Sequence, residues 1–422
     1  MAKATPFTIN VPDEQIKELH QKLQLVTFPD ELEDAGWSMG VPLNDMKRLV
    51  TTWRESFDWR AREKKLNEQL KQFTVPVLVD GFGELDIHVV HHRSENPRSI
   101  PLLFIHGCNV LPRPFSPPDI LIRCSGPGNF LEATKLIPLL TKGDDGASFD
   151  VIAPSLPNFG FSEGAKKRSF GLAQYAETLH KIMIALGYEE YVIQGGDWGA
   201  ILARTMTIYY SQHIKSIHIN FIPCPPPYPW RNPLRFLSSL VSVPFSAKDR
   251  ASIARTMSYI SIDNAYSKQQ SSRPQTLGYG IHDSPVALLA WIYDKLHSWS
   301  EGYAWTDEEI LTWVKAAVEK PELNEANSNV EGERKNWTSL SQALASVAPA
   351  SVRIAVAQFK EELVMWPMAW YRVIGNVVKE KEFDRGGHFA AWEVPELLAQ
   401  DLKEFHGKDG AGYALVEGRD GY

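Results

Sequence analysis

Residues 191–200 have the sequence Tyr-Val-Ile-Gln-Gly-Gly-Asp-Trp-Gly-Ala, which is the most informative segment of the chain for predicting its fold. The apolar start predicts a buried strand, and the small residues predict a sharp turn from that strand into a helix. Small neighbours are needed because the backbone of the central residue is strained and the helix passes close by. The pattern is typical of a nucleophile elbow, with Asp197 where a lipase or esterase has Ser.

An aspartate at this position changes the expected chemistry. Its carboxylate is ionised at pH 7 without help, so it attacks an electrophilic sp³ carbon directly and forms an ester bond to the enzyme. This reaction suits epoxides or alkyl halides better than it suits esters. The alternative is a non-catalytic, glycine-rich turn in which the acid has no role. Residues elsewhere in the chain argue against this alternative.

The segments before the elbow have the pattern of a parallel sheet. Residues 100–107 and 150–154 are short, continuous apolar runs, as expected for parallel strands that are buried on both faces. Amphipathic helical stretches lie between the strands, for example at 173–186. This alternation predicts a doubly wound, mostly parallel α/β sheet, whose functional sites lie at the carboxyl ends of the strands.

The amino-terminal part has a different pattern. Helical spacing of apolar residues begins near Pro12 and recurs over about 43–57, and strand-like alternation follows at 73–77 and 85–90. We interpret residues 1–95 as an accessory segment.

A second change of pattern follows the proline-rich residues 223–229, after which about 120 residues are helical and aromatic. Strand character returns at 352–357 and again at 377–383. An α-helical lid inserted into an α/β core is the simplest account of this order. We therefore predict an N-terminal segment (1–95), a first core part (96–222), a lid (223–346) and a second core part (347–422).

Composition limits the class of protein. The 422-residue chain is 44% hydrophobic and carries a net charge of −7 without a basic block, which argues against nucleic acid and an electrostatic membrane anchor. No apolar run approaches the roughly 20 residues of a transmembrane helix, and the amino terminus lacks a secretory signal. Three cysteines make no disulfide framework. We expect a soluble, reduced, cytoplasmic protein.

Two further residues follow predicted strands in the order of a catalytic triad. Glu362 follows the strand at 352–357, and His388 follows the last strand in Asp-Arg-Gly-Gly-His-Phe-Ala. The order of nucleophile, acid and histidine is that of the α/β hydrolases. Spacing alone does not distinguish Glu362 from Glu361 as the carboxylate that accepts the imidazole N–H.

With these motifs the chain resembles the microsomal-type epoxide hydrolases, fungal branch, over most of its length. The resemblance rests on the N-terminal helical segment, on His-Gly at 106–107, on Pro-Ser-Leu-Pro-Asn-Phe-Gly-Phe-Ser at 154–162, on the Gly-Gly-Asp-Trp-Gly elbow and on Gly-Gly-His-Phe-Ala-Ala at 386–391. It implies the α/β-hydrolase fold, and it implies Glu362 as the acid. It also implies that Tyr266 is a catalytic tyrosine of the lid.

The resemblance implies a reaction in two steps, as well as detoxification or aromatic-hydrocarbon catabolism as its setting. Asp197 opens a small apolar epoxide while lid hydroxyls protonate its oxygen, and His388 with Glu362 then activates water against the ester. The Trp198 N–H is expected to form half of an oxyanion hole. No cofactor and no metal is expected. The sequence does not decide whether the protein forms a homodimer.

The chain departs from the family in two places. After Gly107 the family continues with Trp-Pro-Gly, but here residues 108–126 intervene, so that Cys108 would supply the second oxyanion N–H. Replacing these residues with a single Trp restores the family pattern, which suggests a translated intron; a genuine loop is the alternative. In addition, residues 315–336 contain no Tyr, although the family has its second catalytic tyrosine there.

These departures keep other functions open. A haloalkane dehalogenase also places Trp after an elbow Asp, but it lacks the long amino-terminal segment. A folded relative with an impaired site is an alternative from a different class. A Ser esterase is disfavoured because no Gly-x-Ser-x-Gly lies on a strand.

Overall fold

The computed structural model describes residues 4–107, 128–167, 169–272, 274–318 and 340–422. The intervening segment with Cys108, and most of residues 315–336, lie outside these ranges. The predictions made for them therefore stay predictions.

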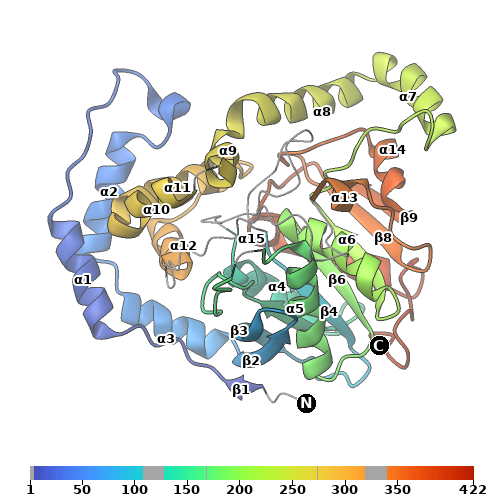
Figure 1. Cartoon of the computed structure of the whole chain (residues 1–422), viewed down its shortest axis with the longest axis horizontal. Helices are drawn as coiled ribbons and strands as arrows, with labels where there is room; N and C mark the ends of the chain where they lie inside the picture. The colour runs from blue at the N-terminus through green and yellow to red at the C-terminus, as the bar shows by residue number, and fades with distance from the viewer. Residues whose placement is uncertain (1–3, 108–127, 168, 273, 319–339) are drawn as a thin grey trace.

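One sheet of nine strands forms the centre of the molecule (Figure 1). The six strands that follow β3 in the sheet are parallel to one another, whereas β1, β2 and β3 pair antiparallel in sequence and β3 joins them to β5. This arrangement confirms the predicted, mostly parallel α/β fold. In spatial order the strands are β1 (Thr5–Pro6), β2 (Gln72–Val79), β3 (Gly83–His92), β5 (Phe149–Pro154), β4 (Ile100–Ile105), β6 (Tyr191–Gly195), β7 (Ile214–Ile219), β8 (Arg353–Gln358) and β9 (Asn376–Glu382).

Strand β7 has no counterpart among the predicted strands. Its residues read Ile-Lys-Ser-Ile-His-Ile, so polar side chains interrupt the apolar run that marks the other core strands. Its place between β6 and β8 buries Ser216 and His218 nevertheless, and His218 Nε2 lies 2.9 Å from the Asp401 carboxylate. A buried polar pair thus occupies a position where a periodicity argument expects an apolar residue.

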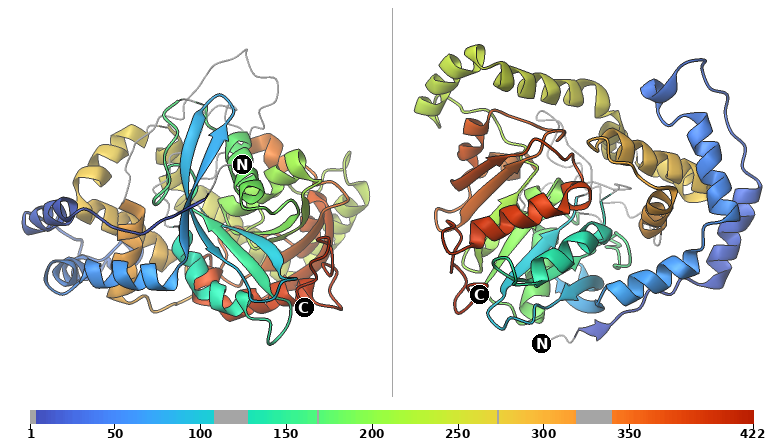
Figure 2. Two further views of the ribbon diagram at one scale, coloured as in Figure 1. Left: turned by 90° about the horizontal axis from the view of Figure 1, so that it is seen from below. Right: turned by 180° about the vertical axis from the view of Figure 1, so that it is seen from behind.

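Helices cover both faces of the sheet. Helices α5 and α6 pack together on one face, while α4 and α16 pack together on the other (Figures 1 and 2). The helices of the core are α4 (Ala133–Thr141), α5 (Leu172–Ala185), α6 (Trp198–Tyr210), α13 (Leu340–Ala345), α14 (Met368–Tyr371), α15 (Ala390–Glu393) and α16 (Pro395–His406), with short 3₁₀ turns at Phe130–Glu132 and Arg372–Ile374.

The helical segment between β7 and β8 forms a layer beyond the sheet (Figure 1). It makes up most of the predicted lid, and this name is kept for it below; α13, which also lies between β7 and β8, contacts α6 of the core instead. Its helices are α7 (Pro233–Phe245), α8 (Ala247–Ser258), α9 (Ala265–Ser272), α10 (Pro274–Asp283), α11 (Pro285–Ser298) and α12 (Asp307–Val318), and a π-helical turn, Tyr259–Asp263, joins α8 to α9.

The amino-terminal helices run along the outside of the lid (Figure 2). They are α1 (Asp13–Gln24), α2 (Leu43–Glu55) and α3 (Trp59–Gln69), with a 3₁₀ turn at Gly36–Met39. From α2, Thr52 Oγ1 donates to the Asp307 carboxylate over 3.0 Å and Arg48 pairs with the same carboxylate. These contacts hold the start of α12 against the N-terminal segment. Within the ranges that the structure describes, none of the helices is long and apolar enough to cross a membrane.

Candidate active site

The turn between β6 and α6 has the geometry of a nucleophile elbow. Asp197 adopts φ 50° and ψ −124°, in the left-handed region that non-glycine residues rarely enter. A Cβ on Gly199 would lie 2.0 Å from the carbonyl oxygen of Ile105, and a Cβ on Gly195 would lie 2.5 Å from Gly199. Backbone atoms cause both clashes, so only glycine fits. This is the physical reason for the small residues on either side of Asp197.

The structure brings the three predicted triad residues into one buried chain. His388 Nε2 lies 3.4 Å from Asp197 Oδ2, and His388 Nδ1 lies 2.5 Å from Glu362 Oε1. The exposed fractions of the three residues are 3% for Asp197, 7% for His388 and 1% for Glu362. An imidazole therefore bridges the elbow carboxylate and a second carboxylate in a site that is shielded from bulk water.

The two carboxylates set the charge of His388. Burial opposes a charge on the imidazole, but Glu362 and Asp197 outweigh it and raise the pKa of His388 well above its ordinary value. Burial raises the pKa of Asp197, while His388 and a backbone hydrogen bond from Trp198 act in the opposite direction. The Trp198 N–H at the start of α6 thus already faces the Asp197 carboxylate, where an oxyanion donor is needed.

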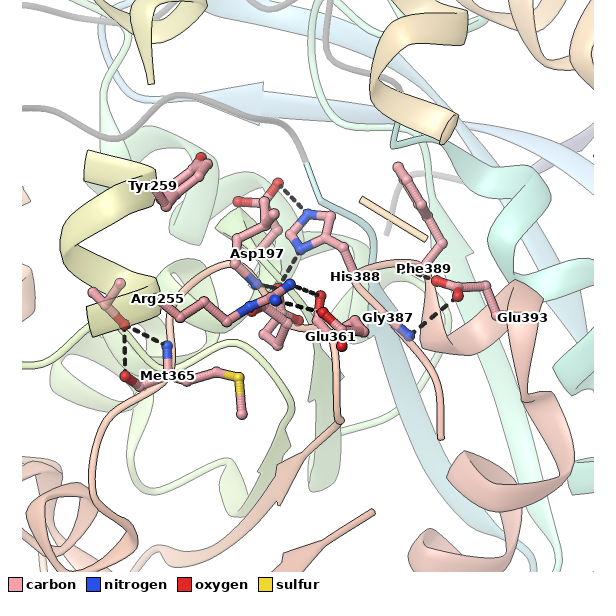
Figure 3. Close-up of polar contacts among 12 residues, drawn as sticks. Asp197, Arg255, Tyr259, Glu361, Met365, Gly387, His388, Phe389 and Glu393 are labelled. Carbon is pink, nitrogen blue, oxygen red and sulfur yellow. Dashed lines mark hydrogen bonds and ion pairs between the residues drawn. The ribbon is translucent and has the colours of Figure 1, made fainter. Parts of the chain in front are cut away.

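The loop that carries His388 is fixed by a half-buried carboxylate and by the lid. Glu393 accepts hydrogen bonds from the backbone N–H groups of Gly387 (3.1 Å) and Phe389 (2.9 Å), which Figure 3 shows. The N–H of His388 itself donates to the carbonyl oxygen of Trp299 in the lid over 2.8 Å. The position of the imidazole therefore depends on both the core and the lid.

The loop that carries the acid is attached to the lid as well. Arg255 of α8 donates to the carbonyl oxygens of Glu362 (2.7 Å) and Glu361 (2.9 Å) and also pairs with the Glu361 carboxylate (Figure 3). The side chain of Glu361 thus points to Arg255, whereas that of Glu362 points to His388. Geometry separates the two neighbouring acids that spacing could not.

The predicted lid tyrosine lies next to the triad together with a second tyrosine. The ring of Tyr266 is 5.3 Å from that of Trp299, which is in turn 5.4 Å from the imidazole of His388. The hydroxyl of Tyr266 is 2.6 Å from the hydroxyl of Tyr259, and both side chains are buried. Sequence reasoning missed Tyr259, because nothing in its local pattern distinguishes it from other lid aromatics.

A small polar cavity adjoins the nucleophile. It leaves about 10 Å³ for the centre of a water-sized molecule, and its lining includes Asp197, His388, Glu132, Gln194 and Asn220. Within the described part of the chain, Gln194 Oε1 is buried and accepts no hydrogen bond, so it offers a free acceptor. The size and the polar lining of this cavity suit a single water molecule.

Glu132 is the second residue that sequence reasoning missed. Burial raises its pKa to about 8, so that a neutral carboxyl group lies in this cavity at neutral pH. The sequence does contain a signal for its position, because Asn129 and Glu132 have the spacing of a capping box, and that capping box is present. The signal indicates a helix start and gives no hint of a role in the site.

Two further predictions for the site concern Cys108 and the absence of a metal ion. Cys108, predicted as an oxyanion donor, lies outside the described residues. Among the residues that the structure describes, no group of three or more His, Cys, Asp or Glu side chains is arranged to hold a metal ion.

Comparisons with known proteins identify the family of the chain. The family model described as Epoxide hydrolase N terminus matches residues 4–110, and that of the alpha/beta hydrolase fold matches residues 118–242. The chain is 31% identical to a protein of Stigmatella aurantiaca that is assigned as an epoxide hydrolase, over 95% of this chain and 84% of the other. It is 29% identical to Epoxide hydrolase 1 of Sus scrofa, over 95% of this chain and 88% of that protein.

A solved structure extends the likeness to three dimensions. Aspergillus niger epoxide hydrolase superposes on this chain with a TM-score of 0.75 at 26% identity, and the match covers 96% of each chain. The resemblance inferred from the motifs is therefore confirmed. The chain belongs to the epoxide hydrolases, a family of enzymes built on the α/β-hydrolase fold.

Proposed function

We propose that this chain hydrolyses an apolar epoxide to a vicinal diol, with Asp197 as the nucleophile and with water activated by His388 and Glu362. The observation that carries the proposal is the buried carboxylate–imidazole–carboxylate chain at the elbow. A carboxylate nucleophile is suited to an electrophilic carbon and leaves an ester for water to hydrolyse. A dehalogenase would share this chemistry, but the family of the chain favours the epoxide.

In the first step, an oxygen of Asp197 forms a bond to one epoxide carbon as the bond from that carbon to the ring oxygen breaks. The electron pair left on the ring oxygen takes a proton from the lid, for which Tyr266 is the proposed donor. Burial raises the pKa of Tyr266 well above that of a free phenol, so the hydroxyl is protonated at neutral pH. It is therefore available as a donor, and an alkoxide is basic enough to take its proton.

In the second step, ester formation prepares His388 to act as a base. The ester carries no charge, so one of the two carboxylates that raise the pKa of His388 is lost. The pKa of His388 then falls and the imidazolium gives its proton to solvent. The neutral imidazole next accepts a proton from the water molecule that attacks the ester carbonyl, which restores the imidazolium. The cavity beside Glu132 and Gln194 is the proposed place of this water. The Trp198 N–H stabilises the oxyanion.

The side chains around His388 favour an apolar substrate. Trp299 and Phe389 stack on each other and both contact the imidazole edge-on, and Trp305 packs edge-on against Phe389. An aryl or alkyl epoxide is the proposed substrate class, with detoxification or aromatic-hydrocarbon catabolism as its setting. A cytoplasmic location, a homodimer and the division of the chain at residues 95, 222 and 346 are further proposals, which rest on the sequence.

The test is diol formation from styrene oxide by the purified 422-residue chain. Asp197→Asn is the matched control, because it keeps the shape of the side chain and removes its charge, and circular dichroism checks that both proteins fold. Diol formation that is lost in Asp197→Asn supports the proposal. A folded wild-type chain without activity on a panel of aryl and alkyl epoxides would favour the alternative of an impaired relative.

A further inference from the structure

The lid lacks a phenol at the position where its family resemblance places the second one. No Tyr occurs between residues 315 and 336. The hydroxyls of two other lid tyrosines have partners away from the nucleophile. Tyr303 donates to Glu309 over 2.8 Å and accepts from Lys135, whereas Tyr293 has its hydroxyl hydrogen-bonded to Arg48 and its ring packed on Trp37 of the N-terminal segment. Neither is placed to assist at Asp197.

Tyr259 has the placement that these two tyrosines lack. Its hydroxyl is 2.6 Å from that of Tyr266, and its side chain is 3% exposed. Figure 3 shows its ring on the lid side of Asp197. The charge of Asp197 acts on both phenols and, together with their burial, keeps them protonated. Two neutral O–H groups thus lie next to each other, close enough to Asp197 for its charge to act on both.

The helix before Tyr259 fixes this placement relative to the triad. Arg255 binds the carbonyl oxygens of Glu361 and Glu362, and Thr256 exchanges two hydrogen bonds with the backbone of Met365, at 2.5 and 2.8 Å. Tyr259 follows these residues by four and three positions, so it lies on the same face of the helix, one turn further on. The contacts that hold the acid loop therefore also orient this phenol.

We propose that Tyr259 is the second phenol of epoxide opening in this chain, and that it acts with Tyr266 on the departing oxygen. The proposal rests on the function proposed above. In the free enzyme one hydroxyl donates to the other, and one O–H stays available. When an epoxide is bound, its oxygen accepts from both hydroxyls.

The proton that a phenol loses during epoxide opening is returned to it after ester hydrolysis. As the carbon–oxygen bond breaks, one phenol gives its proton to the alkoxide and becomes a phenolate, while the second phenol stabilises it by hydrogen bonding. Hydrolysis of the ester regenerates the Asp197 carboxylate and releases one proton. That proton returns to the phenolate, so the net reaction consumes one epoxide and one water and yields one diol.

The test measures the two half-reactions separately. Wild type, Tyr259→Phe and Tyr266→Phe are mixed with styrene oxide under single-turnover conditions, and the ester on Asp197 is followed by quenched-flow mass spectrometry. Tyr279→Phe is the matched control, because Tyr279 is a lid tyrosine that is 70% exposed. We expect ester formation to slow about 10²-fold in Tyr259→Phe, as for the loss of a general acid, with ester hydrolysis and the control close to wild type.

Substituents on the substrate distinguish a proton donor from a residue that only supports the fold. Electron-withdrawing groups make the alkoxide a better leaving group, so the loss in Tyr259→Phe should shrink along a series of substituted styrene oxides. A purely structural defect would slow all members of the series equally. Ester formation at the wild-type rate in Tyr259→Phe, or an equal loss across the series, would overturn the proposal.

A binding experiment keeps the proposal testable if the chain is not active on epoxides. Benzamide offers a carbonyl oxygen that accepts two hydrogen bonds, and calorimetry measures its Kd. We expect Tyr259→Phe and Tyr266→Phe each to weaken binding about tenfold, and Tyr279→Phe to leave it unchanged. If wild type forms no ester, the proposed function fails, and weaker benzamide binding by Tyr259→Phe then shows only that Tyr259 lies at the oxygen-binding position. Unchanged binding in Tyr259→Phe then overturns the role of Tyr259 as well.

Discussion

Adding one methyl group at Gly107 should displace the nucleophile. A Cβ at this position would lie 2.6 Å from Asp197 Cβ and 2.9 Å from Asp197 Oδ2. Carbon atoms in ordinary contact are about 3.5–4.0 Å apart, so the side chain of Asp197 must move by about 1 Å. Asp197 Cβ belongs to a strained turn and cannot rotate away, because its place is set by the backbone.

The size of the effect follows from this displacement. A misplacement of about 1 Å in a reacting group costs about 10²-fold in rate. Overpacking in a dense core also destabilises by about 1–3 kcal/mol. We therefore expect Gly107→Ala to form the ester on Asp197 about 10²-fold more slowly than wild type does, in a protein that is still folded at 25 °C.

The assay is single-turnover ester formation with styrene oxide, with unfolding in guanidinium chloride as a parallel measurement of stability. Gly280→Ala is the control, because no atom lies within 4 Å of its added Cβ and Gly280 lies within helix α10. Alanine in a helix is favoured over glycine, so this variant should keep its rate and gain about 0.5–1 kcal/mol. A wild-type rate in Gly107→Ala would refute the claim that contact with Gly107 positions Asp197.

Three other substitutions test the surroundings of the site. Glu362→Gln should leave His388 without its orienting carboxylate, so the ester should accumulate, visible by mass spectrometry of the intact protein, as turnover falls about 10³–10⁴-fold. In Glu132→Gln, the dependence of stability on pH should change. The pKa of Glu132 rises from 4.5 to about 8 on folding, so wild type loses stability as the pH rises through this window and the variant should not, as measured by denaturant midpoints. Asp401→Asn should lower stability by roughly 3 kcal/mol in denaturant unfolding, because the buried carboxylate pairs with Lys379 over 2.6 Å; a change below 1 kcal/mol would contradict this.

Local pattern was sufficient to predict the elbow and the order of the triad. The elbow depends on a strand, a turn and a helix that are adjacent in sequence, and its glycines are needed for contacts within that unit. His388 and Glu362 follow strands directly, so the carboxyl edge of a parallel sheet brings them near Asp197. Family resemblance chose Glu362 over Glu361, and the structure adds a physical reason in the contact of Glu361 with Arg255.

Tyr259 and β7 could not be predicted because long-range contacts determine their places. Tyr259 lies close to the site because α8, which it directly follows, is bound to residues more than 100 positions later in the chain. Strand β7 is recognisable as a core strand only when His218 is paired with Asp401 from α16. In both cases the sequence near the residue shows its chemistry, while a distant residue determines its environment.

The contacts between lid and triad also support the proposal that the second phenol lies at a different place in this lid. Arg255 binds the backbone carbonyls of the acid loop, and His388 donates its backbone N–H to the carbonyl of Trp299. Backbone groups are present whatever the side chains are, so the lid stays in register with the triad while individual lid residues change. A tyrosine at any lid position that faces Asp197 can then serve as a donor. We propose that Tyr259 occupies such a position, because it directly follows α8, whose Arg255 and Thr256 bind the acid loop.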